Sequence, residues 1–128
     1  MKKILAEISI GELLDKLTIL EIKLKKITDT SSIDKIEKEF KSLKEIDLGK
    51  IDVEKYKSLY EELKSINTKL WDIENEKRLC EKNSDFGEVF IKTSRDIHFL
   101  NDKRGNIKLE INNYTGSSIK EIKEYTSY

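Results

Sequence analysis

The sequence predicts an all-α fold: an antiparallel helical bundle with a long hairpin between its third and fourth helices and coiled-coil-like packing. Two observations predict this class. Charged residues make up 39% of the 128 residues and hydrophobic residues 37%, a mixture that favours amphipathic helices when apolar residues recur every three or four positions. The chain also contains no proline and only five glycines, so little in it interrupts a helix. This length fits one helical domain over residues 1–128.

The first helix is predicted over residues 9–28. Ser9 and Glu12 have the spacing of a capping box, which marks the start of a helix. Ile19 and Ile22 lie on a different face from the main apolar seam, so we expect this helix to be covered on two sides and to lie at the centre. The main seam alternates spacings of three and four, through Ile10, Leu13, Leu17, Leu20, Leu24 and Ile27.

The remaining helices carry seams of the same kind and are predicted over residues 32–46, 52–82, 85–115 and, as a short last segment, 118–125. Ser31–Asp34 and Asp52 can cap the second and third helices. Asn83–Asp85 is the clearest turn, and Gly116 suits the C-cap of the fourth helix. The third and fourth helices, of about 30 residues, would be roughly 45 Å long. The shorter first two helices cannot cover them, so we expect self-association, as a dimer.

Composition argues against several kinds of partner. The chain has 25 basic and 25 acidic residues, so no global field favours nucleic acid, and we expect no nucleic-acid partner. No stretch approaches the roughly 20 apolar residues that span a bilayer, so we expect no membrane partner. A single cysteine, Cys80, rules out an internal disulfide and favours a cytoplasmic protein.

Metal-binding and catalytic patterns are incomplete in this sequence. Glu12 and Asp15 have the spacing of a carboxylate metal motif, but no convincing second pair follows. The single histidine, His98, excludes the two Glu-x-x-His motifs of a di-iron bundle. No Ser–His–Asp set can be assembled around it either. We therefore expect no metal site and no cofactor.

Polar side chains that fall within apolar stripes are the candidate site residues. By helical periodicity, Glu21 falls beside Leu17, and Arg104 falls between Leu100 and Ile107. Charges are rarely buried unless they are paired, so we expect these two either to pair with each other or to line a cavity. Further polar residues lie in or beside the seams of the long helices: Asn67, Glu74, Lys77, Ser94, Asn101 and Lys108.

The hairpin brings more of these residues together. Folding the third helix back onto the fourth places Asp72 near Arg95 and Asn67 near Asn101, with Trp71 at the edge of the seam. Lysine outnumbers arginine 22 to 3, and all the arginines lie in the second half of the chain. This bias indicates that guanidinium geometry matters there, because lysine cannot replace a bidentate or stacked arginine.

Two interpretations of these residues stay open. In one, they form an internal salt-bridge network that fixes the register of the helices. In the other, they line a site for a small anionic ligand in the bundle core, with Glu21 or Glu74 as a catalytic acid or base. The ligand-binding residues would then be Trp71, Asp72, Arg95, Asn101, Arg104 and Lys108.

Several segments together resemble a known family. They are EISIGELLDKLTILEIK (residues 7–23), LWDIE (70–74), NDKRGNIK (101–108) and a C-terminal segment over 116–125. With these segments, the chain resembles a small all-helical family of bacterial and phage proteins of unknown function. The resemblance implies no activity, but it implies a link to cell-surface polysaccharide metabolism.

Two functional hypotheses follow. The first is a helical binding or scaffold protein without catalytic activity, which self-associates and binds a partner protein. The alternative is a small enzyme or binder that acts on an anionic metabolite, a phosphorylated sugar or a nucleotide, in a polar pocket in the bundle core. A cavity at the polar core residues distinguishes them, because the alternative requires one.

Overall fold

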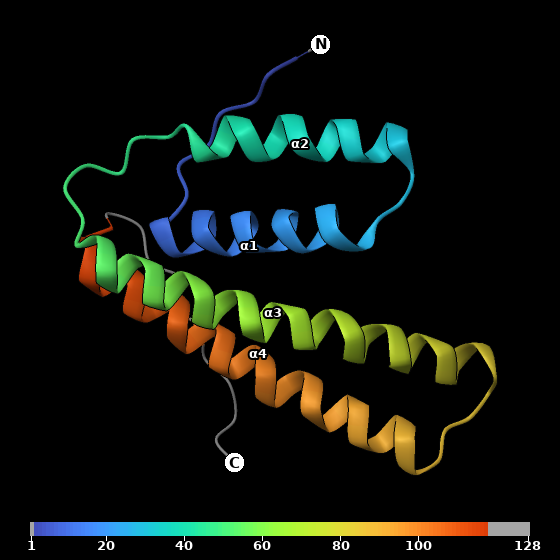
Figure 1. Ribbon diagram of the computed structural model, residues 1–128. Helices are drawn as coiled ribbons and strands as arrows, with labels where there is room; N and C mark the ends of the chain where they lie inside the picture. Colours follow the sequence, from blue (N-terminus) through green and yellow to red (C-terminus); the bar gives the residue numbers. More distant parts are fainter. Residues whose placement is uncertain (1, 118–128) are drawn as a thin grey trace.

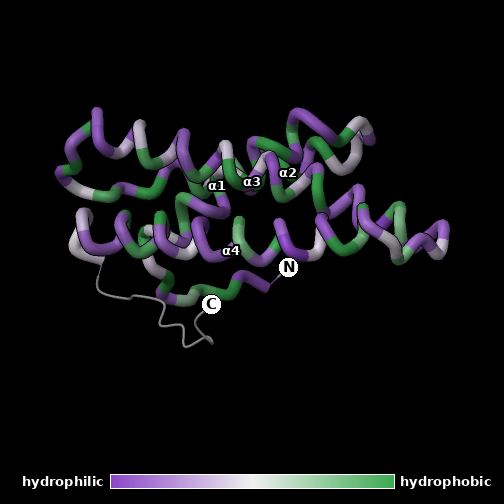
Figure 2. Tube along the Cα trace, turned by 90° about the horizontal axis from the view of Figure 1, so that it is seen from below, coloured by the Kyte–Doolittle hydropathy of each residue, from purple (hydrophilic) through white to green (hydrophobic). Residues whose placement is uncertain are grey.

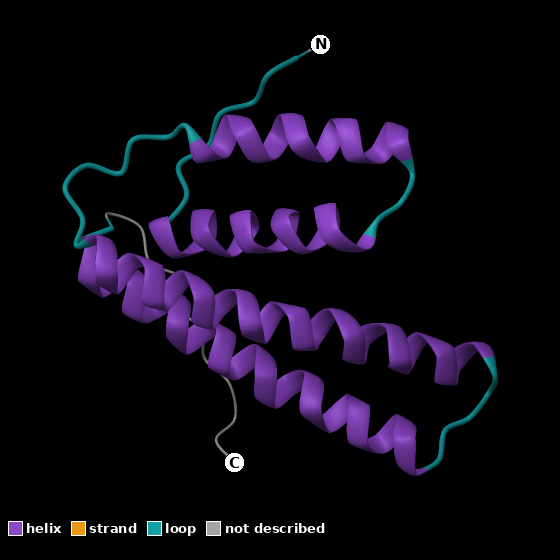
Figure 3. Ribbon diagram, in the orientation of Figure 1, coloured by secondary structure: helices purple, strands orange, loops and turns teal. Residues whose placement is uncertain are grey.

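The computed structural model describes residues 2–117 and confirms the all-α fold. All regular secondary structure in this part of the chain is helical (Figure 3). The four helices are α1 (Ile10–Lys26), α2 (Thr30–Lys44), α3 (Val53–Lys82) and α4 (Glu88–Thr115). The short helix predicted over residues 118–125 lies outside the described residues.

The capping residues explain where the helices begin. Ser9 is the N-cap of α1, and its hydroxyl accepts a hydrogen bond from the Glu12 backbone N–H at 3.0 Å, as the capping spacing predicts. Asp52 caps α3, also as predicted. The predicted start of α2 is wrong by two residues, because Asp29 is its cap and accepts the Ser32 backbone N–H at 2.9 Å. A carboxylate is among the strongest N-caps, so it begins the helix ahead of the serines.

The start of α4 also differs from the prediction, by three residues. Ser84 has a left-handed backbone (φ 51°), and the Asp85 carboxylate accepts the Gly87 backbone N–H at 3.2 Å. These local hydrogen bonds hold the chain in a turn and compete with helix formation. The helix therefore begins at Glu88 rather than at residue 85. It ends at Gly116, whose φ of 68° is the left-handed C-cap that glycine favours.

The helices form two hairpins that pack on each other with α1 at the centre. Figure 1 shows the α1–α2 hairpin lying on one side of the longer α3–α4 hairpin. Helix α1 packs against all three other helices, whereas α2 packs against α1 alone and has no buried residue. The predicted central position of α1 is thus confirmed.

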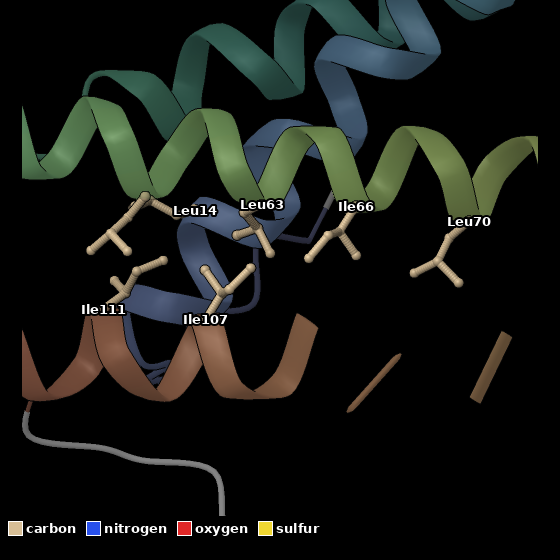
Figure 4. Packing of buried hydrophobic residues seen from close by; sticks show 7 residues of the cluster. Leu14, Leu63, Ile66, Leu70, Ile107 and Ile111 are labelled. Atoms are coloured by element: carbon tan, nitrogen blue, oxygen red, sulfur yellow. The ribbon is translucent and has the colours of Figure 1, made fainter. Parts of the chain in front are cut away.

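The core lies between α1, α3 and α4. Its leucines and isoleucines interdigitate across the α3–α4 pair, as Figure 4 shows for Leu63 and Ile66 on one side and Ile107 and Ile111 on the other. The Leu63 side chain is completely buried, and Leu14 contributes to the same cluster from α1. This burial is the main favourable term in holding the three helices together.

The hairpin register follows the prediction, with the two long helices antiparallel. At the turn end, the Lys77 ammonium lies 5.5 Å from the centre of the Phe90 ring. At the opposite end, the Tyr114 hydroxyl oxygen lies 2.7 Å from the Asp52 backbone nitrogen and accepts its hydrogen. Contacts at both ends therefore fix the pairing of α3 with α4.

The α3–α4 hairpin extends beyond the ends of α1 and α2, so its tip is not covered by them (Figure 1). Exposed apolar side chains gather toward this end: Leu79, Phe86, Val89, Ile91 and Phe99. Elsewhere polar and apolar stretches alternate along the helices (Figure 2). No helix within residues 2–117 has the length and apolar character that crossing a membrane requires.

The first turn of α1 meets the last turns of α4 at very close range. The Gly11 backbone N–H donates to the Asn112 side-chain carbonyl at 2.7 Å, and the Ile10 N–H donates to the Ser117 hydroxyl at 3.1 Å. A Cβ on Gly11 would lie 2.6 Å from the Lys108 carbonyl oxygen. Only glycine therefore allows this approach, because that oxygen belongs to the backbone of a helix and cannot rotate away.

We expect Gly11→Ala to lower the free energy of unfolding by about 1–3 kcal/mol, the usual cost of forcing extra atoms into a packed interface. Chemical denaturation followed by circular dichroism measures this loss. Gly87→Ala is a comparison in which the added Cβ makes only an ordinary contact of 3.4 Å with Asp85, so it loses only the preference of the α4 N-cap for glycine. A Gly11→Ala protein as stable as wild type would show that the α1–α4 approach is not constrained.

Candidate functional site

A buried ion pair joins α1 to α4 at the centre of the bundle. Asp15 is 1% exposed. Its carboxylate accepts two hydrogen bonds from the Arg104 guanidinium, one from Nε at 2.8 Å and a second from Nη2. This two-point geometry is the strong form of the arginine–carboxylate interaction.

Asn67 extends the ion pair to α3. Its side-chain nitrogen donates to the Asp15 carboxylate and to the Thr18 hydroxyl, both at 2.8 Å. The Thr18 hydroxyl in turn donates to the Asp15 backbone carbonyl at 2.7 Å. We call Asp15, Thr18, Asn67 and Arg104 the core network. It ties together the three helices that enclose the hydrophobic core.

Of the two alternatives expected for Arg104 and Glu21, pairing with each other or lining a cavity, the pairing is wrong. Glu21 instead accepts hydrogen bonds from the Tyr60 hydroxyl at 2.6 Å and the Lys64 ammonium at 3.1 Å. Six residues separate Asp15 from Glu21 on α1, a displacement of about 9 Å along the helix axis. Asp15 therefore reaches Arg104, whereas Glu21 contacts residues of α3 that precede Asn67.

Two members of the core network, Asn67 and Arg104, line an open cleft of about 370 Å³ between α1, α3 and α4. Four of the predicted site residues line it: Trp71, Glu74, Asn101 and Arg104. Asn67 lines the same cleft as Asn101. Ile19, Ile22 and Leu70 provide the apolar part of the wall.

Two polar residues of the cleft are missing from the predicted set, Asn75 and Arg78. Helical spacing along α3 could have predicted Arg78 as a site residue. Arg78 follows Glu74 by four residues and Trp71 by seven, so all three share one stripe of the helix. Arginine is rare in this chain, so an arginine on the same helical stripe as the only tryptophan could have been recognised as a candidate site residue.

The other predicted site residues lie elsewhere. The Asp72 carboxylate is exposed and pairs with the Lys26 ammonium at 3.4 Å. Lys108 is buried, and its ammonium pairs with the Glu12 carboxylate at 2.7 Å. Arg95 is exposed on a face of α4 that does not line the cleft. The structure therefore does not bring these residues, or Glu21, into the cleft.

The cleft presents groups suited to a polar ligand that carries a negative charge. Guanidinium groups bind phosphate or carboxylate oxygens through paired hydrogen bonds. Asp15 fixes the orientation of the Arg104 guanidinium, and Arg104 also donates to the side-chain amide oxygen of Asn101 at 3.4 Å. The indole of Trp71 offers a flat surface and an N–H donor. Within residues 2–117, no three His, Cys, Asp or Glu side chains lie close enough together to bind a metal ion.

The environment of Glu21 shifts its titration. Burial alone would raise the pKa of Glu21, but the hydrogen bond from Tyr60 and the hydrogen bond and positive charge of Lys64 lower it. The resulting pKa lies below the ordinary value of 4.5. Burial, and then the contact with Glu21, raise the pKa of Tyr60 well above 10.0. Glu21 is therefore ionised and Tyr60 protonated at neutral pH, which suits a structural hydrogen bond.

Removing the guanidinium tests the core network. We expect Arg104→Ala to destabilise the protein by about 3–5 kcal/mol, because the Asp15 carboxylate would remain buried without its ion-pair partner. Urea denaturation measures the change. Arg78→Ala removes the same group from an exposed site and should stay within about 0.5 kcal/mol of wild type. An Arg104→Ala protein as stable as Arg78→Ala would contradict a structural role for the ion pair.

The lowered pKa of Glu21 predicts a pH dependence of stability. A carboxylate whose pKa is lower in the folded state stabilises that state above its ordinary pKa, and this contribution is lost as the pH falls through the lowered value. Between about pH 6 and about pH 3, wild type should therefore lose more stability than Glu21→Gln. Glu62→Gln, on the exposed side of α3, should lose as much stability as wild type over the same pH range. Parallel losses in all three proteins would contradict the assignment.

The chain was also compared with known proteins. No curated protein and no solved structure matches it. A family of unknown function (DUF6165) matches residues 3–128, which is nearly the whole chain. This agrees with the resemblance found in the sequence, in that the family has no established activity. On the extent of this match, the chain belongs to the family of unknown function DUF6165.

Proposed function

We propose that the protein binds a small anionic metabolite, a phosphorylated sugar or a nucleotide, in the cleft between α1, α3 and α4. One observation carries the proposal. The cleft collects the only tryptophan of the chain, Trp71, and two of its three arginines, Arg78 and Arg104. Chance placement of such rare residues would scatter them over the surface of the four helices.

The dimensions of the cleft agree with this function. Its volume of about 370 Å³ falls within the roughly 300–1,000 Å³ of typical small-molecule sites. Apolar side chains and a few polar groups share its walls, and this mixture is typical of such sites. A sugar phosphate or a mononucleotide is a ligand of suitable size.

Each polar group has a role in this proposal. Arg78 and Arg104 would hold the phosphate, and Asp15 would keep the Arg104 guanidinium in place. Trp71 would stack against the face of a sugar ring or a base. The side chains of Asn75 and Asn101 would hydrogen-bond to hydroxyl groups. In an enzyme, Glu74 would be the acid or base, since it is the acidic residue of this cleft.

Arg78 provides the sharpest test, because its side chain is exposed and belongs to no ion pair of the core network. We expect Arg78→Ala to weaken binding of a phosphorylated sugar by about 10- to 100-fold, the value of a charged hydrogen bond. Its stability should stay within about 0.5 kcal/mol of wild type. Titration calorimetry with glucose 6-phosphate and uridine monophosphate measures the affinity.

Matched controls make this result specific. Arg95→Ala removes the arginine outside the cleft and should bind as wild type does. Unphosphorylated glucose should bind more weakly than its phosphate. A ligand at about 100 times its dissociation constant should also raise the unfolding free energy by roughly 2.7 kcal/mol. Wild type that binds no phosphorylated compound, or Arg78→Ala that binds as wild type does, would contradict the proposal.

A second candidate function is a self-associating binding or scaffold protein. It is supported by the exposed apolar side chains at the hairpin end, where Phe86 is 53% and Ile91 is 56% exposed. Exposed apolar clusters commonly mark surfaces that bind proteins. A cytoplasmic dimer that serves cell-surface polysaccharide metabolism would combine this candidate with the resemblance found in the sequence.

A further inference from the structure

The side of α4 that faces away from the other helices contains a hollow of about 420 Å³. All its lining residues belong to α4: Glu88, Ile91, Lys92, Arg95, Asp96 and Phe99. Five of them, including Ile91 and Phe99, are exposed beyond a third of their surface. The core-facing residues Ile107 and Ile111 lie on the opposite side of this helix.

The spacing of the lining residues is that of a helix prepared to receive another helix. In knobs-into-holes packing, one side chain inserts between four residues at positions i, i+3, i+4 and i+7. Glu88, Ile91, Lys92 and Arg95 form one such hole. Lys92, Arg95, Asp96 and Phe99 form the next. The hollow therefore provides two successive holes for a helix laid along α4.

We propose that this face binds α4 of a second copy of the chain, in antiparallel orientation; this inference rests on the self-association proposed above. The charges along α4 favour a second copy of α4 as the helix that binds here. In the antiparallel arrangement, Lys92 faces Asp102 of the second copy and Arg95 faces Phe99 of the second copy. Glu88 then faces Asn106 of the second copy. Each contact occurs twice by symmetry, so the seam contains two ion pairs and two cation–π contacts.

Other arrangements of the same face are less favourable. A parallel dimer in register sets Lys92 against Lys92 and Arg95 against Arg95, and like charges repel at this distance. An antiparallel dimer shifted by one heptad in one direction sets Lys92 against Arg95. A shift in the other direction sets Phe99 against Asp102, which removes the cation–π contact. Among these arrangements, the first antiparallel register alone is complementary along the seam.

The test exchanges the charges of one predicted pair. Lys92→Asp should leave two facing carboxylates at each end of the seam, and Asp102→Lys should leave two facing ammonium groups. Each single variant should therefore dimerise at least ~10-fold more weakly than wild type. Lys92 pairs with Asp96 in its own helix at 2.7 Å, but this pair is exposed, so its loss should leave the fold intact. Analytical ultracentrifugation over a range of concentrations measures the dimer affinity.

Two combinations should restore the dimer. The double variant Lys92→Asp with Asp102→Lys recovers both ion pairs within a homodimer. An equal mixture of the two single variants should form a heterodimer, because one supplies only carboxylates and the other only ammonium groups at these positions. Restoration in both cases can occur only if residues 92 and 102 face each other across an antiparallel seam.

Lys69→Asp on α3 is the matched control, since Lys69 is exposed and does not line the hollow. It should dimerise as wild type does. A wild-type chain that stays monomeric at about 0.5 mM would overturn both this inference and the proposed self-association. If the dimer affinity is unchanged by the charge exchanges, this inference alone is overturned, because self-association would then use another surface.

Discussion

The fold depends on one buried carboxylate. Asp15 lies on the central helix, and its charge is offset by the guanidinium of Arg104 and the amide of Asn67. Because an unpaired charge in the interior is costly, α1, α3 and α4 pack favourably only in the register in which both groups reach Asp15. The leucines and isoleucines of the core would tolerate sliding and rotation far better. Asp15 therefore provides specificity, while the apolar core provides most of the binding free energy between helices.

The structural and functional interpretations of these residues are not exclusive. Arg104 is 29% exposed on its side chain, so it belongs both to the core network and to the wall of the cleft. The carboxylate behind it holds the guanidinium in one orientation before a ligand arrives. A preorganised group loses less entropy on binding than a mobile lysine would. This arrangement gives a physical reason for arginine at this position in a chain so rich in lysine.

Local patterns in the sequence predicted much of the fold. The caps at Ser9 and Asp52 and the C-cap at Gly116 depend on residues close in the chain, and helical periodicity located the long hairpin. The partner of Arg104 could not be predicted in the same way. Nearly every residue in the first turns of α1 is buried, so periodicity did not distinguish the side of Asp15 from the side of Glu21. That choice depends on the rotation of α1 against two other helices.

The weakest attachment in the structure is that of α2. It packs against α1 alone, it has no buried residue, and its ion pair between Glu39 and Lys16 is exposed. Its detachment would leave the core network and the hairpin in place, because neither the core cluster nor the core network includes a residue of α2. The chain therefore has two levels of cooperativity, an inner unit of α1, α3 and α4 and an outer helix that opens at lower free energy. Such partial unfolding would uncover one flank of α1 while the cleft stays formed.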